Sequence, residues 1–549
     1  MGRLRRMFRW AEVPEREDIY TWKGTTKWGN HDLYPIDPKE RTFTWLSYWS
    51  IFVTNGVNIS TFTLGSSFIS YGLTAGQTIG GVLAGTCISA VVSYLSSRPG
   101  LDYHMGYAMI NRSSFGLWGN TIPIGVVFIG GVVFTGLQSY FGGQALTIVL
   151  SAIIPQFRDM PNTLPESAGT TTQRLVGFIL YSILIFSMVL AVPPAKIRRC
   201  LYPAFFVILT TFLSILIWAL ATNRGTGDLI SSPVELTKSR RAFRMIQCIS
   251  SVGGSYGGAA ERFSDWTRFS KTRRAPTSAN LLALPLTITF SATIGVLVTT
   301  ATYNIYGTLL WNPLELLTHI LQTSYTPAAR AGVFFAGLGL LGTQISMNLI
   351  LNVQLYGMDL AGLFPTYISQ KRGAAGLIIA TVILQPWRFL GQAAFFITIL
   401  SVFTIFHASH TSIAMADYWI IRKKKWVVPD LFDPAGIYWF TGGWNLRAVA
   451  ALVIGMAPAC PGFIINVINP KTDNALVRMY QLTWFISLPI SLVVYMGLCW
   501  AYPLEGLGRK ELLPGPTETE GVEVAAETSS QEVSGTKPAK GPQVIAEPF

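Results

Sequence analysis

The sequence is poor in charged residues. Only 13% of its 549 residues are Asp, Glu, Lys or Arg, half are hydrophobic, and the mean hydropathy is +0.41. Soluble domains carry about a quarter charged residues. This shortage excludes an ordinary soluble protein and indicates a chain that lies largely in a lipid bilayer.

The chain also lacks the signatures of several common activities. It has no G-x-x-x-x-G-K-[ST] nucleotide loop, no selectivity-filter sequence, and no nucleophile, base and orienting group at suggestive spacing. We therefore expect no enzyme activity, no cofactor, no bound metal and no ATP-driven transport. The five cysteines stand at unrelated spacings, which predicts small packing residues rather than a disulfide framework: Cys87, Cys200, Cys248, Cys460 and Cys499.

Long apolar stretches recur through most of the chain. A helix needs about 20 mainly apolar residues to cross a bilayer, and about 12 such windows predict an all-α membrane protein. The predicted spans are residues 43–66, 72–96, 120–152, 172–193, 201–222, 243–260, 279–305, 328–352, 374–386, 391–420, 446–468 and 478–502. Together they make a transmembrane domain over residues 43–503. Residues 1–42 are expected to form a cytosolic segment, and the polar residues 504–549 a disordered cytosolic tail.

The net charge of +13 comes largely from loops between spans rather than from one folded face, so we expect no nucleic-acid partner. Four basic clusters fall on one side of a twelve-span topology, in residues 3–9, 196–199, 268–274 and 422–425. The positive-inside rule makes that side cytosolic, which places both termini there. Arg240, Arg241 and Arg244 run against this assignment. No apolar segment of a signal peptide follows the first arginines.

Two spans look interrupted at mid-depth. Residues 54–58 (T-N-G-V-N) fall inside span one, and residues 253–258 (G-G-S-Y-G-G) inside span six. Non-helical backbone at that depth is tolerated only where it is buried in protein or lines a cavity. Interruptions five spans apart predict a 5+5 inverted-repeat core with two extra helices, as in secondary transporters. The alternative is that the glycines only permit close helix packing.

Polar side chains inside other spans add candidate sites. Gln138 and Asn352 are amides that are costly in hydrocarbon unless they face a ligand or another helix. His407 and His410, three residues apart, share one helical face. No ligand-spaced Asp, Glu or Cys accompanies them for a metal, whereas proton handling and simple packing both stay open.

Several motifs lie in a fixed order along the chain. They are N-H-D-L-Y-P at 30–35, R-T-F-T-W at 41–45, R-S-S-F-G at 112–116, S-D-W-T-R-F at 264–269, G-M-D-L-A-G-L-F-P at 357–365 and G-W-N-L-R-A at 443–448. This set resembles the nucleobase-cation-symport-1 family, and within it the fungal branch of uracil, allantoin, uridine and thiamine permeases. Ser264 stands where that family usually has proline, and Leu446 is an insertion.

The resemblance implies that spans one, three, six, eight and ten surround a planar heterocycle. The family clamps the ring between aromatics of spans three and six, which match Phe134 and Tyr256. It reads the ring's edges with amides of spans three and eight, which match Gln138 and Asn352. Aromatic faces and amide donors and acceptors suit a flat ring with C=O and N–H groups. Nucleobase carriers commonly have Trp at both aromatic positions, so a differently shaped ligand is expected.

The resemblance also bears on the coupled ion. Bacterial members hold sodium between spans one and eight, where Ser346 occupies a hydroxyl position and Met347 replaces its neighbour. A thioether is a poor ligand for a hard cation, so a proton is expected rather than sodium. Asp265 and Asp359 are further candidates for coupling or gating, and for Asp359 a helix-end cap or gate salt bridge is equally open.

These observations predict a proton-coupled secondary symporter in the plasma membrane that imports a uracil-, allantoin- or nucleoside-like heterocycle. One alternative keeps the fold and changes the ligand to thiamine or nicotinamide riboside, because residues 357–363 are close to the thiamine-type branch. A more distant alternative is a non-transporting nutrient receptor. Nothing in the sequence indicates an oligomeric state.

Overall fold

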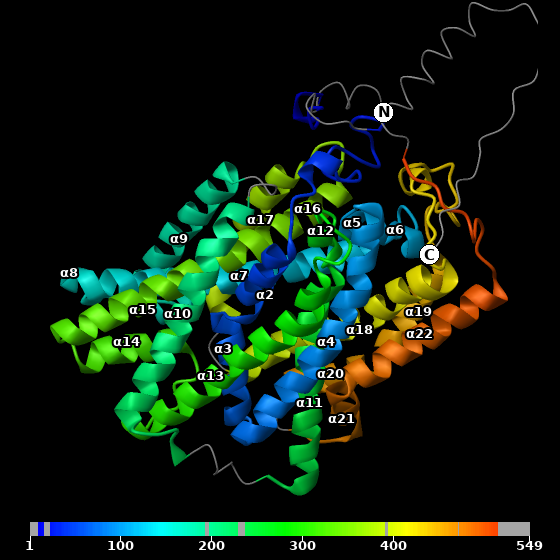
Figure 1. The fold of residues 1–549 in the computed structure, drawn as a ribbon. Coiled ribbons are helices and arrows are strands. Elements are labelled where there is room, and N and C mark those ends of the chain that lie inside the picture. Colours follow the sequence, from blue (N-terminus) through cyan, green and yellow to red (C-terminus); the bar gives the residue numbers. More distant parts are fainter. Residues whose placement is uncertain are drawn as a thin grey trace, which may run out of the picture.

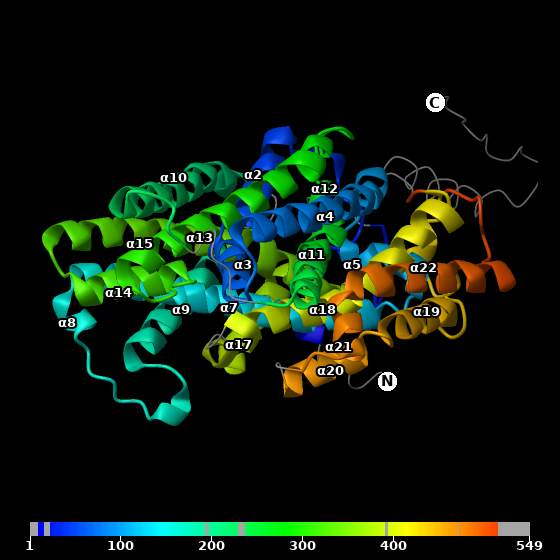
Figure 2. The same ribbon diagram turned by 90° about the horizontal axis from the view of Figure 1, so that it is seen from below.

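Helices account for almost all regular structure in the computed structural model of this chain. It describes residues 9–15, 22–192, 197–228, 236–389, 393–469 and 472–513. Within these ranges the only β-type pairings are isolated bridges, so the all-α class predicted from the sequence is confirmed. Figures 1 and 2 show an elongated bundle in which helices from both halves of the chain interleave.

The first half of the chain provides the following helices: α2 (Trp45–Gly56), α3 (Ile59–Ser70), α4 (Ala75–Tyr103), α5 (Tyr107–Ile110), α6 (Arg112–Phe115), α7 (Thr121–Ile153), α8 (Pro155–Arg158), α9 (Thr172–Ala191), α10 (Arg198–Asn223), α11 (Lys238–Glu261) and α12 (Ser264–Thr267). The second half provides α13 (Leu284–Tyr306), α14 (Pro313–Thr323), α15 (Pro327–Met347), α16 (Gln354–Leu363), α17 (Gln370–Leu384), α18 (Ala393–Met415), α19 (Leu446–Met456), α20 (Cys460–Ile468), α21 (Ala475–Gln481) and α22 (Thr483–Ala501). Short 3-10 turns are η1 (Arg9–Ala11), η2 (Pro38–Glu40), η3 (Glu166–Ala168), η8 (Pro386–Phe389) and η10 (Pro429–Phe432), and π-helical turns are η6 (Ala279–Ala283), η7 (Asn348–Val353) and η9 (Ala416–Ile421).

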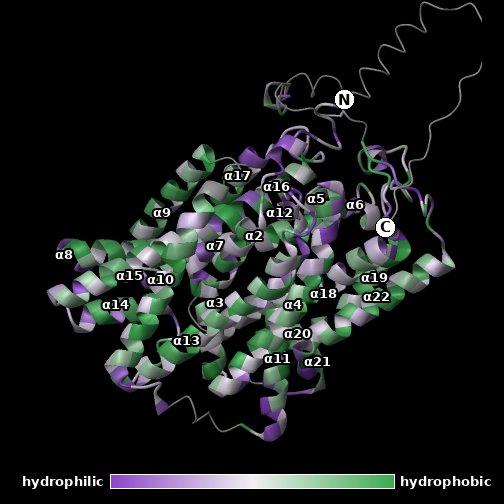
Figure 3. Ribbon diagram, in the orientation of Figure 1, coloured by the Kyte–Doolittle hydropathy of each residue, from purple (hydrophilic) through white to green (hydrophobic). Residues whose placement is uncertain are grey.

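Apolar residues cover the long helices, whereas polar residues gather near the helix ends and loops (Figure 3). In the described residues seven helical segments are long and apolar enough to cross a membrane, and the pair α19–α20, bent by 45°, makes an eighth. Large apolar side chains such as Phe206, Ile217 and Val493 are exposed on the outside of the bundle, as expected for lipid contact.

Predicted span ten contains α18, with 23 mainly apolar residues, whereas three other predicted spans are shorter or more polar than a simple crossing helix. The helices α2 and α3 have 12 residues each, and α17 has 15, so none of them crosses a bilayer alone. The helix α11 begins with a run of basic residues. The total of twelve spans therefore stays a prediction.

Span one is divided into α2 and α3 within the predicted stretch 54–58. Val57 ends α2 and Asn58 has an extended backbone at the start of α3. The Asn58 side chain forms hydrogen bonds with backbone groups on both sides of the break. Its Oδ1 accepts a hydrogen bond from the Thr61 N–H at 3.0 Å, and its Nδ2 donates to the Asn55 carbonyl at 2.6 Å.

Span six departs from the prediction, because α11 is continuous through residues 253–258 and ends only at Glu261. The glycines allow neighbouring helices to approach closely. A Cβ on Gly254 would lie 2.1 Å from the Thr404 hydroxyl oxygen, and one on Gly257 would lie 2.9 Å from the Trp484 ring. Packing thus explains these glycines, and the helical path breaks instead at Arg262 and Phe263, before α12.

Span eight is longer than predicted. The segments α15, η7 and α16 form one apolar helical stretch, Pro327–Leu363, where the sequence predicted an end at residue 352. The π-helical turn η7 lies in its middle and contains Asn348 and Asn352. Such turns widen a helix locally and are frequent at functional sites. The amphipathic helix α14, which precedes this stretch, was not predicted.

The segment before α2 and the segment after α22, here called the terminal segments, both reach the loop of residues 422–445, at the same end of the molecule (Figure 1). On the N-terminal side, Lys23 forms an ion pair with Asp433 at 3.1 Å. On the C-terminal side, the Glu511 N–H donates to the Trp426 carbonyl and its own carbonyl accepts from the Val428 N–H, both at 2.9 Å. Residues 504–513, assigned to the tail by sequence, therefore pack against this loop, and residues 514–549 lie outside the described residues.

Candidate functional site

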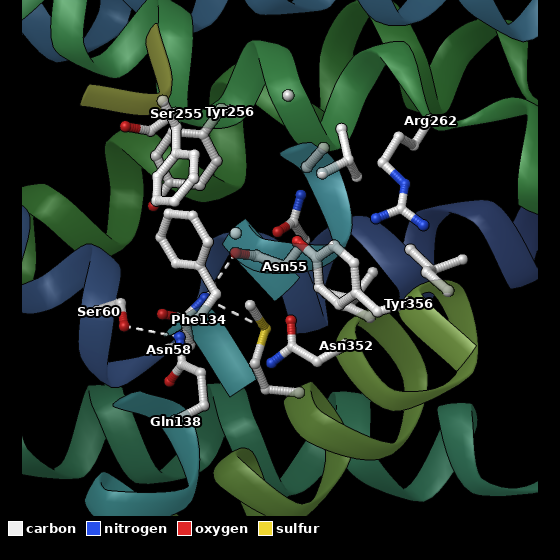
Figure 4. Close-up of a pocket in the computed structure, with 18 of the residues that line it drawn as sticks. Asn55, Asn58, Ser60, Phe134, Gln138, Ser255, Tyr256, Arg262, Asn352 and Tyr356 are labelled. Carbon is white, nitrogen blue, oxygen red and sulfur yellow. Dashed lines mark hydrogen bonds between the residues drawn. The ribbon is translucent and has the colours of Figure 1, made fainter. Parts of the chain in front are cut away.

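A cavity of about 110 Å³ lies between both halves of span one, α7, α11, span eight and α18 (Figure 4). The four side chains predicted to bind substrate all line it, although they come from three separate spans: Phe134, Gln138, Tyr256 and Asn352. Asn55, Asn58 and Ser60 from the break in span one complete the polar part of the wall.

The two predicted amides are held by neighbouring polar groups. Gln138 donates from Nε2 to the Ser60 hydroxyl at 2.7 Å, and its Oε1 is buried with no hydrogen-bond partner among the described residues. Asn352 donates from Nδ2 to Oδ1 of Asn348 at 2.8 Å. Because a buried acceptor without a partner costs about 1–3 kcal/mol, the Gln138 oxygen is suited to accept an N–H from a ligand.

The two predicted aromatics provide flat apolar surface to the cavity. Tyr256 is fixed by a hydrogen bond of 2.6 Å between its hydroxyl and that of Thr61 in α3. Phe134 packs against Phe403 of α18, with ring centroids 5.4 Å apart. Both rings border the same space as the amides in Figure 4, so a planar ligand can contact aromatic faces and amide edges at once.

Arg262, which the sequence analysis did not single out, brings a positive charge to the cavity wall (Figure 4). Its Nη2 lies 2.8 Å from Oδ2 of Asp359 and 3.5 Å from Oδ2 of Asp265. The guanidinium of Arg262 is therefore paired with two buried carboxylates. Arg262, at the end of span six, is therefore the partner of Asp359 in the salt bridge that the sequence left open.

The two histidines of α18 point at one carboxylate, that of Glu261, which the sequence analysis also missed. His407 Nδ1 lies 2.8 Å from Oε1 and His410 Nδ1 lies 3.1 Å from Oε2. All three side chains are buried, and His407 also lines the cavity. Glu261 lies one residue beyond the predicted end of span six, so a later span boundary would have indicated it.

The position predicted from bacterial sodium sites looks different. The Ser346 hydroxyl donates to the Gly342 carbonyl of its own helix at 2.9 Å, and Ser346 is not among the residues that line the cavity. The Met347 thioether does line it and lies 3.9 Å from Nδ2 of Asn58 at the break in span one. Among the described residues, no group of His, Cys, Asp and Glu is arranged to hold a metal ion.

A cavity at the break of a helix, inside an all-helical membrane bundle, is typical of secondary transporters. Residues 35–487 match the family described as "Permease for cytosine/purines, uracil, thiamine, allantoin". The chain belongs to this family of permeases, and the resemblance seen in its motifs is confirmed.

Relatives named as transporters support the same class. The thiamine transporter of Saccharomyces cerevisiae is 30% identical over 514 residues, which cover 92% of this chain and 84% of that protein. Nicotinamide riboside transporter 1 of the same yeast is 30% identical over 482 residues, which cover 87% and 80%.

Among solved structures, Mhp1 has a similar fold. Mhp1 is described as a nucleobase-cation-symport-1 family transporter, here in a closed conformation with bromovinylhydantoin bound. The TM-score is 0.65 at 16% identity, with 90% of this chain and 99% of Mhp1 covered. The predicted class of inverted-repeat transporter fold is therefore confirmed.

Proposed function

We propose that this permease is a proton-coupled symporter that imports an uncharged planar heterocycle with amide-type edges, of the uracil, allantoin or nucleoside kind. The observation that carries this proposal is the buried Oε1 of Gln138, which has no partner among the described residues and belongs to a side chain that lines the same cavity as Phe134 and Tyr256. A ring N–H satisfies that oxygen, and the aromatic faces cover the ring.

The charge of the cavity wall supports a neutral ligand. Among the described residues that line the cavity, the basic side chains are those of Arg262 and His407, and no carboxylate is present. Arg262 is also a hydrogen-bond donor in this wall, which suits ring carbonyls. A permanently cationic ring next to Arg262 is repelled instead.

The second candidate is a thiamine or nicotinamide riboside transporter, and it rests on the two yeast relatives at 30% identity. A cation in this cavity needs a compensating negative charge or an aromatic cage. Glu261 lies directly behind His407, and Tyr256 and Phe134 offer two ring faces. Both candidates therefore use the same cavity and differ in which wall the ligand contacts.

We further propose a proton rather than sodium as the coupled ion. Met347 occupies the cavity at the break in span one, where a hard cation needs oxygen ligands. We propose residence in the plasma membrane with both termini in the cytosol, because the terminal segments share one end of the molecule with the basic residues 422–425.

The decisive experiment is uptake of labelled uracil, allantoin, uridine, thiamine and nicotinamide riboside in a yeast strain without its own carriers. Each compound is tested at acidic and neutral pH, with and without a protonophore, and with sodium replaced by N-methyl-D-glucamine. We expect saturable uptake of a neutral heterocycle. This uptake should be abolished by the protonophore and should not depend on sodium. Uptake of only a cationic vitamin overturns the first proposal in favour of the second, and sodium dependence overturns the assignment of the ion.

A further inference from the structure

Glu261 is unusual among the buried charges of this molecule in the number of groups that converge on it. Its Oε1 is contacted by His407 Nδ1 at 2.8 Å and by the Tyr107 hydroxyl at 3.3 Å. Its Oε2 is contacted by His410 Nδ1 at 3.1 Å and by the Thr411 hydroxyl at 2.6 Å. The carboxylate is thus shared by two titratable rings, one on each oxygen.

The charges around Glu261 leave the histidines as its basic partners. Within the described part of the chain, the ion-pair partners of Glu261 are His407 and His410 from α18. The neighbouring Arg262 is engaged by Asp359 and Asp265 instead. From other elements, Tyr107 of α5 and both Tyr356 and Asp359 of α16 also act on Glu261 electrostatically, and none of these three carries a positive charge.

This cluster separates two cavities. His407 lines the substrate cavity described above. Glu261 and His410 line a second cavity of about 30 Å³ on the other side, together with Tyr107, Thr411 and Tyr418. Because a water needs roughly 10–15 Å³ of such space and two or more polar partners, the second cavity has room for water.

His410 lines that second cavity and packs between two aromatic rings. Its ring lies between those of Phe115 and Phe406, at centroid distances of 5.5 and 5.3 Å and nearly parallel to both. One ring nitrogen contacts Glu261, and the other, Nε2, has no hydrogen-bond partner among the described residues. A buried polar nitrogen without a partner is suited to exchange a proton with water.

The second cavity continues towards the end that carries the terminal segments. Tyr418, in its wall, donates a hydrogen bond of 2.6 Å to Oδ2 of Asp102. Asp102 in turn lines an open basic hollow of about 520 Å³ that includes Lys423, Lys424 and Lys425. Polar groups therefore connect Glu261 to the surface at this end without passing through the substrate cavity.

We propose that Glu261, His407 and His410 form the site of the coupled proton, loaded from the substrate cavity through His407 and emptied through His410 into the second cavity. This inference rests on the proposed function, since it assigns the proton that drives uptake. It also gives proton and substrate separate exits.

The transfer balances with one proton. A proton taken up on Nε2 of His407 makes an imidazolium, which gives its Nδ1 proton to Glu261. The neutral carboxyl group rotates so that its protonated oxygen faces His410, and it gives the proton to Nδ1 of that ring, which starts in its Nε2–H tautomer. His410 then releases its Nε2 proton to water in the second cavity, and Glu261 is again a carboxylate. His407 is left with its proton on Nε2 and His410 with its proton on Nδ1, and a turn of each ring restores the starting tautomers.

Counterflow and accumulation separate this role from substrate binding. Counterflow exchanges labelled for unlabelled substrate and needs no net proton movement, whereas accumulation does. One proton moving through about 100 mV of driving force supports roughly fifty-fold accumulation of a neutral substrate. For Glu261→Gln we expect counterflow close to that of the wild type, accumulation reduced to equilibration, and no substrate-induced alkalinisation of the medium.

His410→Gln gives a second, independent variant, because His410 does not line the substrate cavity. If Glu261→Gln fails to reach the cell surface, His410→Gln tests the proposal in its place. We expect it to lose accumulation and to retain counterflow in the same way. The matched controls are Glu315→Gln and His319→Gln, a carboxylate and a histidine one turn apart on α14, outside both cavities. Both controls should accumulate substrate like the wild type.

The outcomes distinguish this site from the proposed function. Proton-driven accumulation in the wild type that persists in Glu261→Gln and His410→Gln overturns the proton site while the function stands. Parallel loss of counterflow and accumulation in both variants at normal surface levels also overturns it, because the residues then serve binding or structure. Absence of transport by the wild type overturns the proposed function and the proton site with it.

Discussion

At the scale of single residues, Gly258 shows how a missing side chain shapes the site. A Cβ at this position would lie 2.6 Å from Nε2 and 2.9 Å from Cε1 of His407. Real Cβ atoms do not approach so closely, so Gly258 provides the room in which the His407 ring lies between the cavity and Glu261. Gly258, in the glycine-rich stretch of span six, therefore allows the His407 side chain of α18 to take its position.

Gly258→Ala is expected to displace the His407 ring and to destabilise the protein by about 1–3 kcal/mol through overpacking. Gly80→Ala on α4 is the matched control, because nothing lies within 4 Å of its Cβ position. There, alanine is expected to be neutral or to stabilise the helix by up to about 1 kcal/mol. Thermal unfolding of both detergent-purified variants measures the difference. Equal melting temperatures would show that the His407 ring moves aside freely.

Gln138 carries the substrate proposal at the residue scale. Gln138→Ala removes the buried acceptor, and a ligand N–H is then left unpaired at a cost of about 1–3 kcal/mol. This corresponds to a rise in KM of roughly 5- to 150-fold or to complete loss of measurable uptake. Uptake kinetics at matched surface expression provide the measurement. Gln144→Ala, on the same helix but outside the cavity, should transport normally. Unchanged kinetics for Gln138→Ala contradict its role in binding.

Motif matching could place some of the site from the sequence but not all of it. Phe134, Gln138, Tyr256 and Asn352 were assigned by their positions relative to motifs, and all four line one cavity. Glu261 could not be assigned in this way. Its importance depends on histidines 146 and 149 residues away, and such a contact leaves no local pattern in the chain.

At the scale of elements, the ion pair between Arg262 and Asp359 joins the end of span six to span eight. The two side chains are 2% and 0% exposed, so each charge depends on the other for compensation. Breaking a buried pair by removing one partner costs about 3–5 kcal/mol, because the remaining charge stays buried. This contact therefore fixes the position of the two spans that contribute Tyr256 and Asn352 to the cavity.

Asp359→Asn is expected to lower stability strongly, by about 3–5 kcal/mol. The control is Asp473→Asn, which breaks a surface pair with Arg478 whose side chains are 31% and 37% exposed. Exposed pairs contribute about 0–1 kcal/mol, so this variant should resemble the wild type. Thermal unfolding in detergent compares the two. If Asp359→Asn and Asp473→Asn unfold at the same temperature, Asp265 alone compensates the charge of Arg262.

Helix breaks were harder to predict than helices. In span one the pattern T-N-G-V-N contains Asn58, whose side chain caps the new helix, and the break falls there. In span six the pattern G-G-S-Y-G-G also contains a residue of a capping type, Ser255, but α11 continues through it and the glycines make close tertiary contacts. A run of glycines alone indicates either flexibility or close packing, and only the neighbouring helices decide between them.

At the scale of the whole molecule, the two terminal segments are connected through one loop. The Arg112 Nη1 donates to the carbonyls of Trp28 and Leu431, at 2.7 and 2.8 Å, which ties the N-terminal segment to this loop. Glu511 pairs with the backbone of Trp426 and Val428 in the same loop. The adjacent residues Lys423 and Lys424 border the basic hollow at the proposed proton exit.

This arrangement predicts different effects for two truncations of the C-terminus. Removal of residues 514–549 deletes a polar segment with little to bury, and uptake should stay within about twofold of the full chain. Removal from residue 504 onwards also deletes buried Leu504 and the pairing of Glu511, which leaves the Val428 N–H and the Trp426 carbonyl without their partners. We expect the longer truncation to reduce uptake and thermal stability together, because this loop also holds the N-terminal segment. Uptake at matched surface levels tests both variants. Normal transport by the longer truncation would show that the loop keeps its conformation without the segment 504–513.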